Sequence, residues 1–167
     1  MQRFQTKAWV GCVRITRMIQ AKYVHTNLTA QDWRKLAAFY TDVFGCTLVP
    51  PERDYQNEKI DAVTGLHNVH LCGVHLRLPG WGYEGPTLEI FNFAVLAGRE
   101  AKTINQPGFG HIAFAVDDVE AARAAVLAHG GAAVGEVVTL TTAIGTSVTT
   151  CYMTDPEGNA IELQRWT

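Results

Sequence analysis

Four residues of types that bind metal ions stand on predicted strands, and all of them except His25 have strongly apolar neighbours: His25, Glu89, His111 and Glu162. They form a histidine-then-glutamate pair that occurs once in each half of the chain. Two imidazoles and two carboxylates suit Zn, Ni, Co, Mn or Fe(II), and they leave coordination positions for water or substrate oxygens. We therefore predict that these four residues hold one divalent metal ion, whose identity the residue types leave open.

Each of these residues taken alone also has an ordinary structural explanation. A strand of an antiparallel sheet alternates between core and solvent, so Glu89 and Glu162 could simply face water between apolar neighbours. A single histidine is more often a hydrogen-bonded core or surface residue than a ligand. The repetition of the same pair at matching places favours the metal site.

The elements that must position these residues also occur twice. The first half predicts a strand, a helix and three further strands, at 23–28, 33–43, 46–49, 69–78 and 87–93. The second half predicts the same order at 109–116, 119–127, 134–140, 147–154 and 160–166. Pro50-Pro51 is expected to end its strand, and the charged stretch that follows, up to Asn68, is expected to be a longer loop.

This order predicts an α+β fold of two βαβββ modules, residues 22–105 and 106–167, that together form one domain. Two copies of one unit can pack about a pseudo-two-fold axis, and equivalent strands then converge on one shared cleft. Residues 1–21 are predicted to be an N-terminal extension. They are either an arm that packs on the domain or sequence that precedes a functional start at Met18.

Composition excludes several classes of function. The 167 residues suffice for one domain, and a net charge of -2 without a basic stripe argues against nucleic-acid binding. No apolar stretch approaches the roughly 20 residues of a membrane helix. The four cysteines make no C-x-x-C pair, so they predict ordinary core or surface residues in a reducing, cytoplasmic protein: Cys12, Cys46, Cys72 and Cys151.

The sequence resembles the vicinal oxygen chelate superfamily. This superfamily includes glyoxalase I, methylmalonyl-CoA epimerase, ring-cleaving dioxygenases and fosfomycin or bleomycin resistance proteins. The resemblance is carried by four segments, 25–28, 39–45, 108–118 and 155–163, and it extends from about residue 22 to the C-terminus. It implies a glyoxalase-like fold for residues 22–167, with a curved mixed sheet around the cleft. The ligand order His, Glu, His, Glu is that of glyoxalase I, whereas epimerases commonly place Gln where Glu89 stands, and ring-cleaving dioxygenases usually use two His and one Glu.

The resemblance implies a metal-dependent lyase or isomerase that moves a proton next to a carbonyl of a small, oxygen-chelating substrate. Glu162 or Glu89 would be both ligand and base. Thr29 and Pro107 stand where glyoxalases often carry basic residues, which implies a substrate other than a glutathione derivative. Weaker candidates for the base lie in the charged stretch, where a solvated loop is the simpler explanation: Glu52, Asp54 and Glu58.

Strand alternation predicts which side chains share the cleft with the ligands. The substrate-cleft candidates are Tyr23, Asn27, Phe91, Phe109 and Gln164, with Thr87 and Ala113 on the same face. Trp81 and Tyr83 lie on a predicted turn, where they could cover the mouth of the cleft or be ordinary surface aromatics. An aromatic lining indicates a substrate with an apolar part.

Two other functions stay open at this point. One is an Fe(II)-dependent ring-cleaving dioxygenase, against which the second glutamate argues. The other is a drug-binding or resistance protein of the same fold that performs no chemistry; such proteins often lack the metal ligands that are complete here. We expect a homodimer that binds a small molecule, and the cleft could be formed within one chain or across the dimer.

Overall fold

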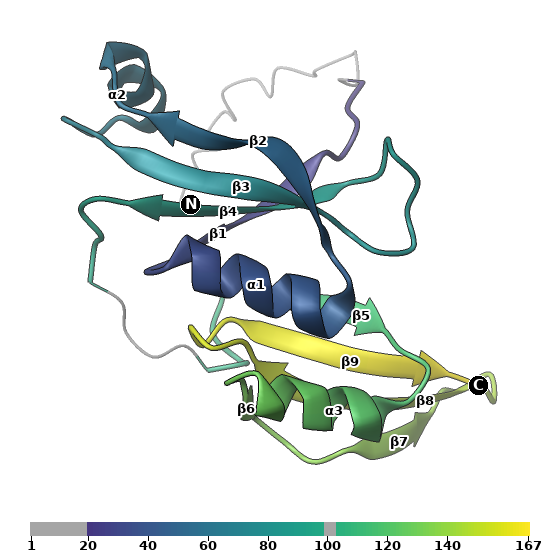
Figure 1. Ribbon diagram of the computed structural model, residues 1–167. Coiled ribbons are helices and arrows are strands. Elements are labelled where there is room, and N and C mark those ends of the chain that lie inside the picture. Colours follow the sequence, from purple (N-terminus) through teal and green to yellow (C-terminus); the bar gives the residue numbers. More distant parts are fainter. Residues whose placement is uncertain (1–19, 99–102) are drawn as a thin grey trace, which may run out of the picture.

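A computed structural model of the protein describes residues 20–98 and 103–167, so most of the predicted N-terminal extension lies outside the described residues. Within the described residues the chain folds into two mixed sheets with a helix on one face of each (Figure 1). The predicted α+β class is confirmed. None of the helices in the described part of the chain has the length and apolar character to span a bilayer.

The first sheet has the strand order β1-β4-β3-β2. Its strands are β1 (His25–Thr29), β2 (Thr47–Tyr55), β3 (Leu71–Arg77) and β4 (Thr87–Phe93). β1 runs parallel to β4, and the other neighbours are antiparallel. This arrangement places the first and the last strand of the half side by side, so a residue of β1 can meet a residue of β4.

Helix α1 (Trp33–Phe44) covers one face of this sheet. The helix begins where the Asp32 side chain accepts a hydrogen bond from the backbone N–H of Lys35, and it ends at Gly45, which adopts a left-handed conformation with φ of 69°. Its buried face includes Leu36 and Tyr40, which recur at helical spacing. This helix corresponds to the one predicted at 33–43.

The second sheet repeats this topology in the order β5-β9-β8-β6, with β7 paired to β8. Its elements are β5 (Ile112–Ala115), α3 (Val119–Ala128), β6 (Ala132–Ala133), β7 (Val138–Thr141), β8 (Ser147–Thr154) and β9 (Ala160–Trp166). β5 is parallel to β9, as β1 is to β4. Between the described residues no backbone pairing joins β1 to β5, so the sheets remain separate.

Three local predictions were wrong. β2 continues through Pro50-Pro51 instead of ending there, because a register shift between Val49 and Arg53 accommodates residues that have no N–H to donate. The expected loop contains helix α2 (Glu58–Thr64), which the Asn57 side chain caps. The single strand expected at 134–140 is replaced by β6 and β7.

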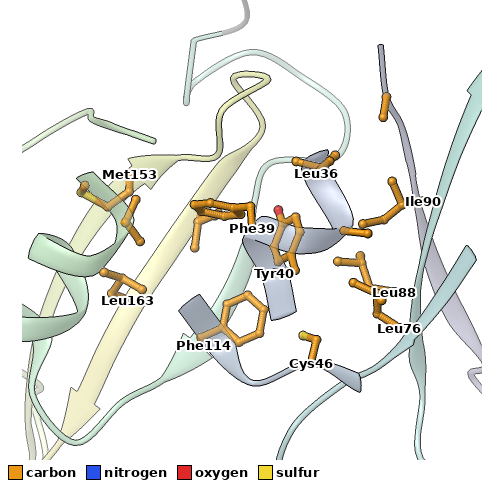
Figure 2. Packing of buried hydrophobic residues seen from close by; sticks show 14 of the residues in the cluster. Leu36, Phe39, Tyr40, Cys46, Leu76, Leu88, Ile90, Phe114, Met153 and Leu163 are labelled. Atoms are coloured by element: carbon orange, nitrogen blue, oxygen red, sulfur yellow. The ribbon is translucent and has the colours of Figure 1, made fainter. Parts of the chain in front are cut away.

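One hydrophobic core joins the two halves, and α1 lies at its centre (Figures 1 and 2). On one side the helix packs against Leu76, Leu88 and Ile90 of the first sheet. On the other side the Phe44 ring stacks on Phe114 of β5 with the ring centres 4.0 Å apart. The helix of the first half therefore fixes the position of the second sheet.

Polar contacts at the β8–β9 turn reinforce this junction. The buried carboxylate of Asp155 accepts hydrogen bonds from the Tyr40 hydroxyl at 3.0 Å and from the backbone N–H of Asn159 at 2.8 Å. The Glu157 carboxylate accepts from the backbone N–H groups of Gln31 and Asp32, just before α1. Burial raises the pKa of Asp155, against the lowering effect of these hydrogen bonds. The β8–β9 turn is thus also a polar link between the halves.

Replacing Tyr40 by phenylalanine should lower the free energy of unfolding by about 1.5–3 kcal/mol, the usual contribution of a hydrogen bond to a charged group. The change removes only the hydroxyl and leaves the ring in the core. Urea unfolding followed by circular dichroism measures the effect. Tyr55→Phe, at a more exposed position, is the matched control and should leave the curve unchanged. Coincident curves for wild type and Tyr40→Phe would show that the buried hydrogen bond contributes nothing.

Candidate metal centre

The first histidine–glutamate pair is assembled by β1 and β4. His25 opens β1 and Glu89 is a central residue of β4, with Nε2 of the histidine 3.7 Å from Oε2 of the glutamate. The Asn27 amide donates a hydrogen bond of 2.9 Å to the same Oε2. Parallel pairing of the two strands places Asn27 opposite Glu89. The structure therefore places His25 beside Glu89, on the face of the sheet that points away from α1.

His75 belongs to the same cluster and was not predicted. It pairs with Glu89 across β3 and β4, and its Nε2 lies 2.9 Å from Oε1 of Glu89. The ring centres of His75 and His25 are 5.5 Å apart. Burial lowers the pKa of His75, although the Glu89 carboxylate acts in the opposite direction. Burial thus favours the neutral imidazole, which is the form that binds metals.

A signal for His75 was present in the sequence. Pro79 and Gly80 mark a turn between β3 and β4, and a hairpin built around this turn places His75 opposite Glu89. Strand alternation then puts both side chains on one face. The signal for His75 is therefore the register of the hairpin, which the pattern of a single strand does not contain.

The second pair is assembled by β9 and the residue that precedes β5. Nε2 of His111 lies 3.1 Å from Oε2 of Glu162. Oε1 of Glu162 accepts a hydrogen bond of 2.9 Å from the Thr150 hydroxyl, which is buried. The Tyr152 ring lies against His111, with the ring centres 5.1 Å apart. Both carboxylates of the predicted set thus carry a neutral hydrogen-bond donor on one oxygen and face a histidine.

The two pairs do not meet within one chain. In the described part of the chain, no three potential ligand atoms drawn from both halves lie within 4.8 Å of one another. One group of three residues with ligand atoms this close does contain predicted ligands, and it consists of His25, His75 and Glu89. The structure therefore places the four predicted residues as two equivalent half-sites and not as one closed centre.

A large cavity connects these half-sites. It has a volume of about 1370 Å³, and its lining includes both His25 and His111. Apolar side chains contribute to the wall, among them Leu28, Leu96 and Ile112. A smaller cavity of about 320 Å³ opens beside His25 and is also lined by His75 and Tyr83. His25 borders both cavities.

Some of the predicted cleft residues line the large cavity, and others lie outside its lining. Tyr23, Asn27 and Phe109 line the large cavity, and Phe109 is 93% exposed there. Phe91 lies outside the lining, with its ring 6.1 Å from that of His75. Gln164 is also outside the lining and accepts a hydrogen bond from the Trp166 indole N–H.

Other predicted contributors to the site have different neighbours. Of the two turn aromatics, Tyr83 lines the small cavity, and Trp81 lines neither this cavity nor the large one. Glu52 forms an ion pair with Arg34 at 2.7 Å. Asp54 lies 2.8 Å from His70 on another part of the sheet, and Glu58 lies in the first turn of α2. These contacts do not connect the three weaker base candidates to either half-site.

The chemistry of the donors fits a divalent ion of the Zn, Ni, Co, Mn or Fe type. Each half-site offers one exposed imidazole and one partly buried carboxylate, with the side chains of Glu89 and Glu162 only 14% and 17% exposed. A hydrogen bond to one carboxylate oxygen orients the group, as is usual around metal ligands. Two such pairs would supply four ligands and leave positions open for substrate.

Comparison with known proteins identifies the family and the fold of the chain. A family model described as "Glyoxalase/Bleomycin resistance protein/Dioxygenase superfamily" matches residues 22–163. No curated protein matches the sequence significantly.

Solved structures with the same fold cover nearly all of the chain. A glyoxalase family protein from Bacillus cereus superposes with a TM-score of 0.71 at 20% identity, covering 93% of this chain and 99% of that one. A glyoxylase/bleomycin resistance protein/dioxygenase domain from Frankia gives 0.57 at 16% identity, covering 89% and 100%. A mutant of glyoxalase I from Zea mays gives 0.60 at 25% identity, covering 86% of this chain and 44% of the maize chain. The first two likenesses concern the fold alone.

Proposed function

Because the chain belongs to the Glyoxalase/Bleomycin resistance protein/Dioxygenase superfamily, we propose that it is a divalent-metal-dependent lyase or isomerase that moves a proton next to a carbonyl. The observation that carries this proposal is the pair of equivalent half-sites, His25 with Glu89 and His111 with Glu162. A binding protein without chemistry has no need of two histidine–glutamate pairs. Free cysteines at the described positions Cys46, Cys72 and Cys151 are in keeping with a cytoplasmic enzyme.

The four side chains would act as the ligands of one ion. A divalent ion bound there supplies positive charge that stabilises the negative charge developing on adjacent substrate oxygens as a neighbouring carbon loses its proton. The apolar part of the cavity wall would hold the remainder of the substrate and exclude water. We propose a small substrate that chelates through two oxygens and contains no glutathione.

Glu162 is the better candidate for moving the proton. One of its oxygens faces His111, and the other accepts a hydrogen bond from the hydroxyl of Thr150. Glu89 is held more firmly, because His75, His25 and Asn27 all contact its carboxylate. A carboxylate with fewer partners can exchange a hydrogen bond for the substrate proton at a lower energetic cost. We therefore assign the base to Glu162 and the orienting ligand role to Glu89.

We further propose that the active form is a homodimer. The half-sites of one chain lie on separate sheets and are each open, so a second copy can bring its own His111–Glu162 pair to His25–Glu89. A two-fold dimer would complete two such sites at once. Exposed aromatic side chains beside the half-sites, Tyr23 and Phe109, would become buried in this arrangement.

The proposed reaction is tested by solvent exchange at carbon. The protein is loaded separately with Zn, Ni, Co, Mn and Fe(II) and incubated in deuterium oxide with hydroxyacetone, whose vicinal oxygens can chelate. Loss of the C–H signal in proton NMR with at least one metal, and not with metal-free protein, is the expected result. Metal binding without any exchange of hydroxyacetone or of other α-hydroxy carbonyl compounds would contradict proton-transfer chemistry.

A second function is favoured by one observation. His25, His75 and Glu89 form a group of two histidines and one carboxylate, which is the donor set of non-haem Fe(II) oxygenases. The first half-site could on this account bind Fe(II) without the second. Consumption of dissolved oxygen by the Fe(II)-loaded protein in the presence of catechol would support the oxygenase. Its absence, together with C–H exchange, would support the lyase or isomerase.

The role of His75 separates these two functions. If His75 only orients Glu89, then His75→Ala should weaken metal binding by about 10–100-fold, the usual effect of losing a partner of a ligand. His25→Ala should weaken it far more. Competition with a chromophoric chelator measures both affinities. Equal losses in the two variants would show that His75 is itself a ligand and would favour the Fe(II) oxygenase.

A further inference from the structure

A second group of metal-binding side chains lies on the first sheet, apart from the half-sites. Asp54 of β2, His70 just before β3 and Cys72 of β3 place one potential ligand atom each within 4.8 Å of the others. Nε2 of His70 lies 2.8 Å from Oδ1 of Asp54 and 3.3 Å from Sγ of Cys72. We propose that this group, the Asp–His–Cys cluster, is a binding site for a Zn²⁺-type divalent ion, distinct from the proposed catalytic centre.

Backbone geometry fixes the cluster. Asp54 and Cys72 are directly paired residues of the antiparallel strands β2 and β3, in the part of the ladder that follows the register shift. His70 and Cys72 are two residues apart and therefore lie on the same side of the chain. The convergence thus follows from strand register and not from the chance meeting of long side chains.

The cluster is separate from the half-site on the same sheet. Cys72 and His75 are three residues apart on β3, so their side chains point to opposite faces. The side chain of Cys72 packs against the core that surrounds α1, whereas His75 lies with Glu89 on the other face. An ion held by the cluster would therefore not share a ligand with the proposed catalytic metal.

The geometry argues against a nucleophilic cysteine. A Cys–His–Asp relay needs the two ring nitrogens of the histidine, one toward the thiol and one toward the carboxylate. Here the same nitrogen of His70 faces both partners. Burial, followed by the charge of Asp54, raises the pKa of Cys72, which keeps the free thiol protonated. The cluster is therefore poorly arranged to activate sulfur but well arranged to share one cation.

The distances need little adjustment for a metal. Bond lengths of about 2.0–2.3 Å to N, O and S place tetrahedral donors roughly 3.3–3.6 Å apart. The separation of His70 and Cys72 already has this value, and Asp54 must withdraw by only a few tenths of an ångström. Its side chain is 74% exposed and is free to do so. On binding, the thiol proton leaves to solvent and the thiolate bonds the ion.

A metal here would secure the edge of the first sheet. β2 is the outer strand in the order β1-β4-β3-β2, and its backbone ladder is interrupted between Val49 and Arg53. A bond from the ion to Asp54 would tie the far part of this strand to β3. We therefore expect a structural ion that raises thermal stability, with a fourth position left for water.

Co²⁺ titration of the protein without a histidine tag provides the test, because thiolate-to-cobalt charge transfer absorbs in the near ultraviolet. The proposed catalytic centre has no sulfur ligand, so this band reports on the cluster alone. The wild type and His111→Ala should both develop the band. In each protein its final intensity should correspond to one sulfur-bound Co²⁺ ion per chain. Cys72→Ser should abolish it, and Asp54→Asn should weaken the binding that produces it. Cys12→Ser, which removes a cysteine outside the described residues, is the matched control and should keep the band.

Two results would overturn the site. One is the absence of the band in the wild type at excess Co²⁺ under reducing conditions. The other is its persistence in Cys72→Ser, which would assign the sulfur ligand to another cysteine. As a second readout, Zn²⁺ should raise the melting temperature of the single variant His111→Ala. It should not raise that of the double variant that carries both His111→Ala and Cys72→Ser. No shift in either variant would likewise contradict a structural ion. Because these readouts use the His111→Ala background, they stay valid if the proposed catalytic function fails.

Discussion

Replacing Glu162 by glutamine is expected to slow hydroxyacetone C–H exchange by about 10²–10⁴-fold, the range in which a positioned acid or base contributes to catalysis. The amide keeps the shape of the side chain and can still accept from the Thr150 hydroxyl, so the sheet should be undisturbed. It cannot accept a proton. Exchange rates in deuterium oxide are measured at saturating metal, so that they report the loss of proton transfer and not a loss of metal affinity.

Two comparisons make this result specific. Glu120→Gln, in the first turn of α3, removes a carboxylate from the exposed surface and should exchange at the wild-type rate. Glu89→Gln should lose metal affinity, because it removes the carboxylate that three side chains orient. If Glu162→Gln exchanged as fast as wild type once loaded with metal, the base would have to be another group and our assignment of roles would be wrong.

Mixing two inactive variants should restore activity if each centre is built from two chains. After co-refolding, a dimer of Glu89→Gln with Glu162→Gln would contain one centre with both changes and one with neither. A random mixture should therefore recover roughly a quarter of the wild-type activity, because half of the two-fold dimers are mixed and each has one intact site of two. The exchange assay on the mixture, compared with each variant alone, measures this recovery.

The matched control pairs two changes in the same half-site. Mixing Glu89→Gln with His25→Ala should restore nothing, because every centre then contains an altered first half. A restoration equal to that of the first mixture would point to an effect of refolding. No recovery in either mixture, or a monomer by light scattering, would place the centre within one chain and refute the proposed dimer.

Much of the fold was predictable because its signals are local. Asp32 and Gly45 mark the ends of α1, and the strands predicted at 87–93 and 160–166 have the bounds of β4 and β9. The repeat of these signals then predicted the equivalence of His25 with His111. The prediction that Pro50-Pro51 ends a strand was wrong, because proline is compatible with a strand where the ladder is interrupted. Such an interruption depends on the partner strand.

The assembly of the site was less accessible from the sequence. The meeting of His75 with Glu89 depends on which residues pair across two strands, and the contact of Tyr40 with Asp155 depends on how α1 packs between the sheets. The Asp–His–Cys cluster likewise requires the register of β2, which follows an interruption that composition does not reveal. The pairing of residues that are distant in the sequence decides how the site is assembled, and the identity of single residues does not reveal this pairing.

The central claim, that the two histidine–glutamate pairs bind one catalytic metal per chain, is tested most directly by metal content. Wild type, His111→Ala and the matched control His129→Ala, which replaces an exposed histidine at the end of α3, are purified without a tag and analysed for elements. To exclude the Asp–His–Cys cluster, all three carry Cys72→Ser. We predict about one divalent ion per chain in the first and third proteins and almost none in His111→Ala. Equal metal in all three, or none in any after reconstitution, would contradict the claim.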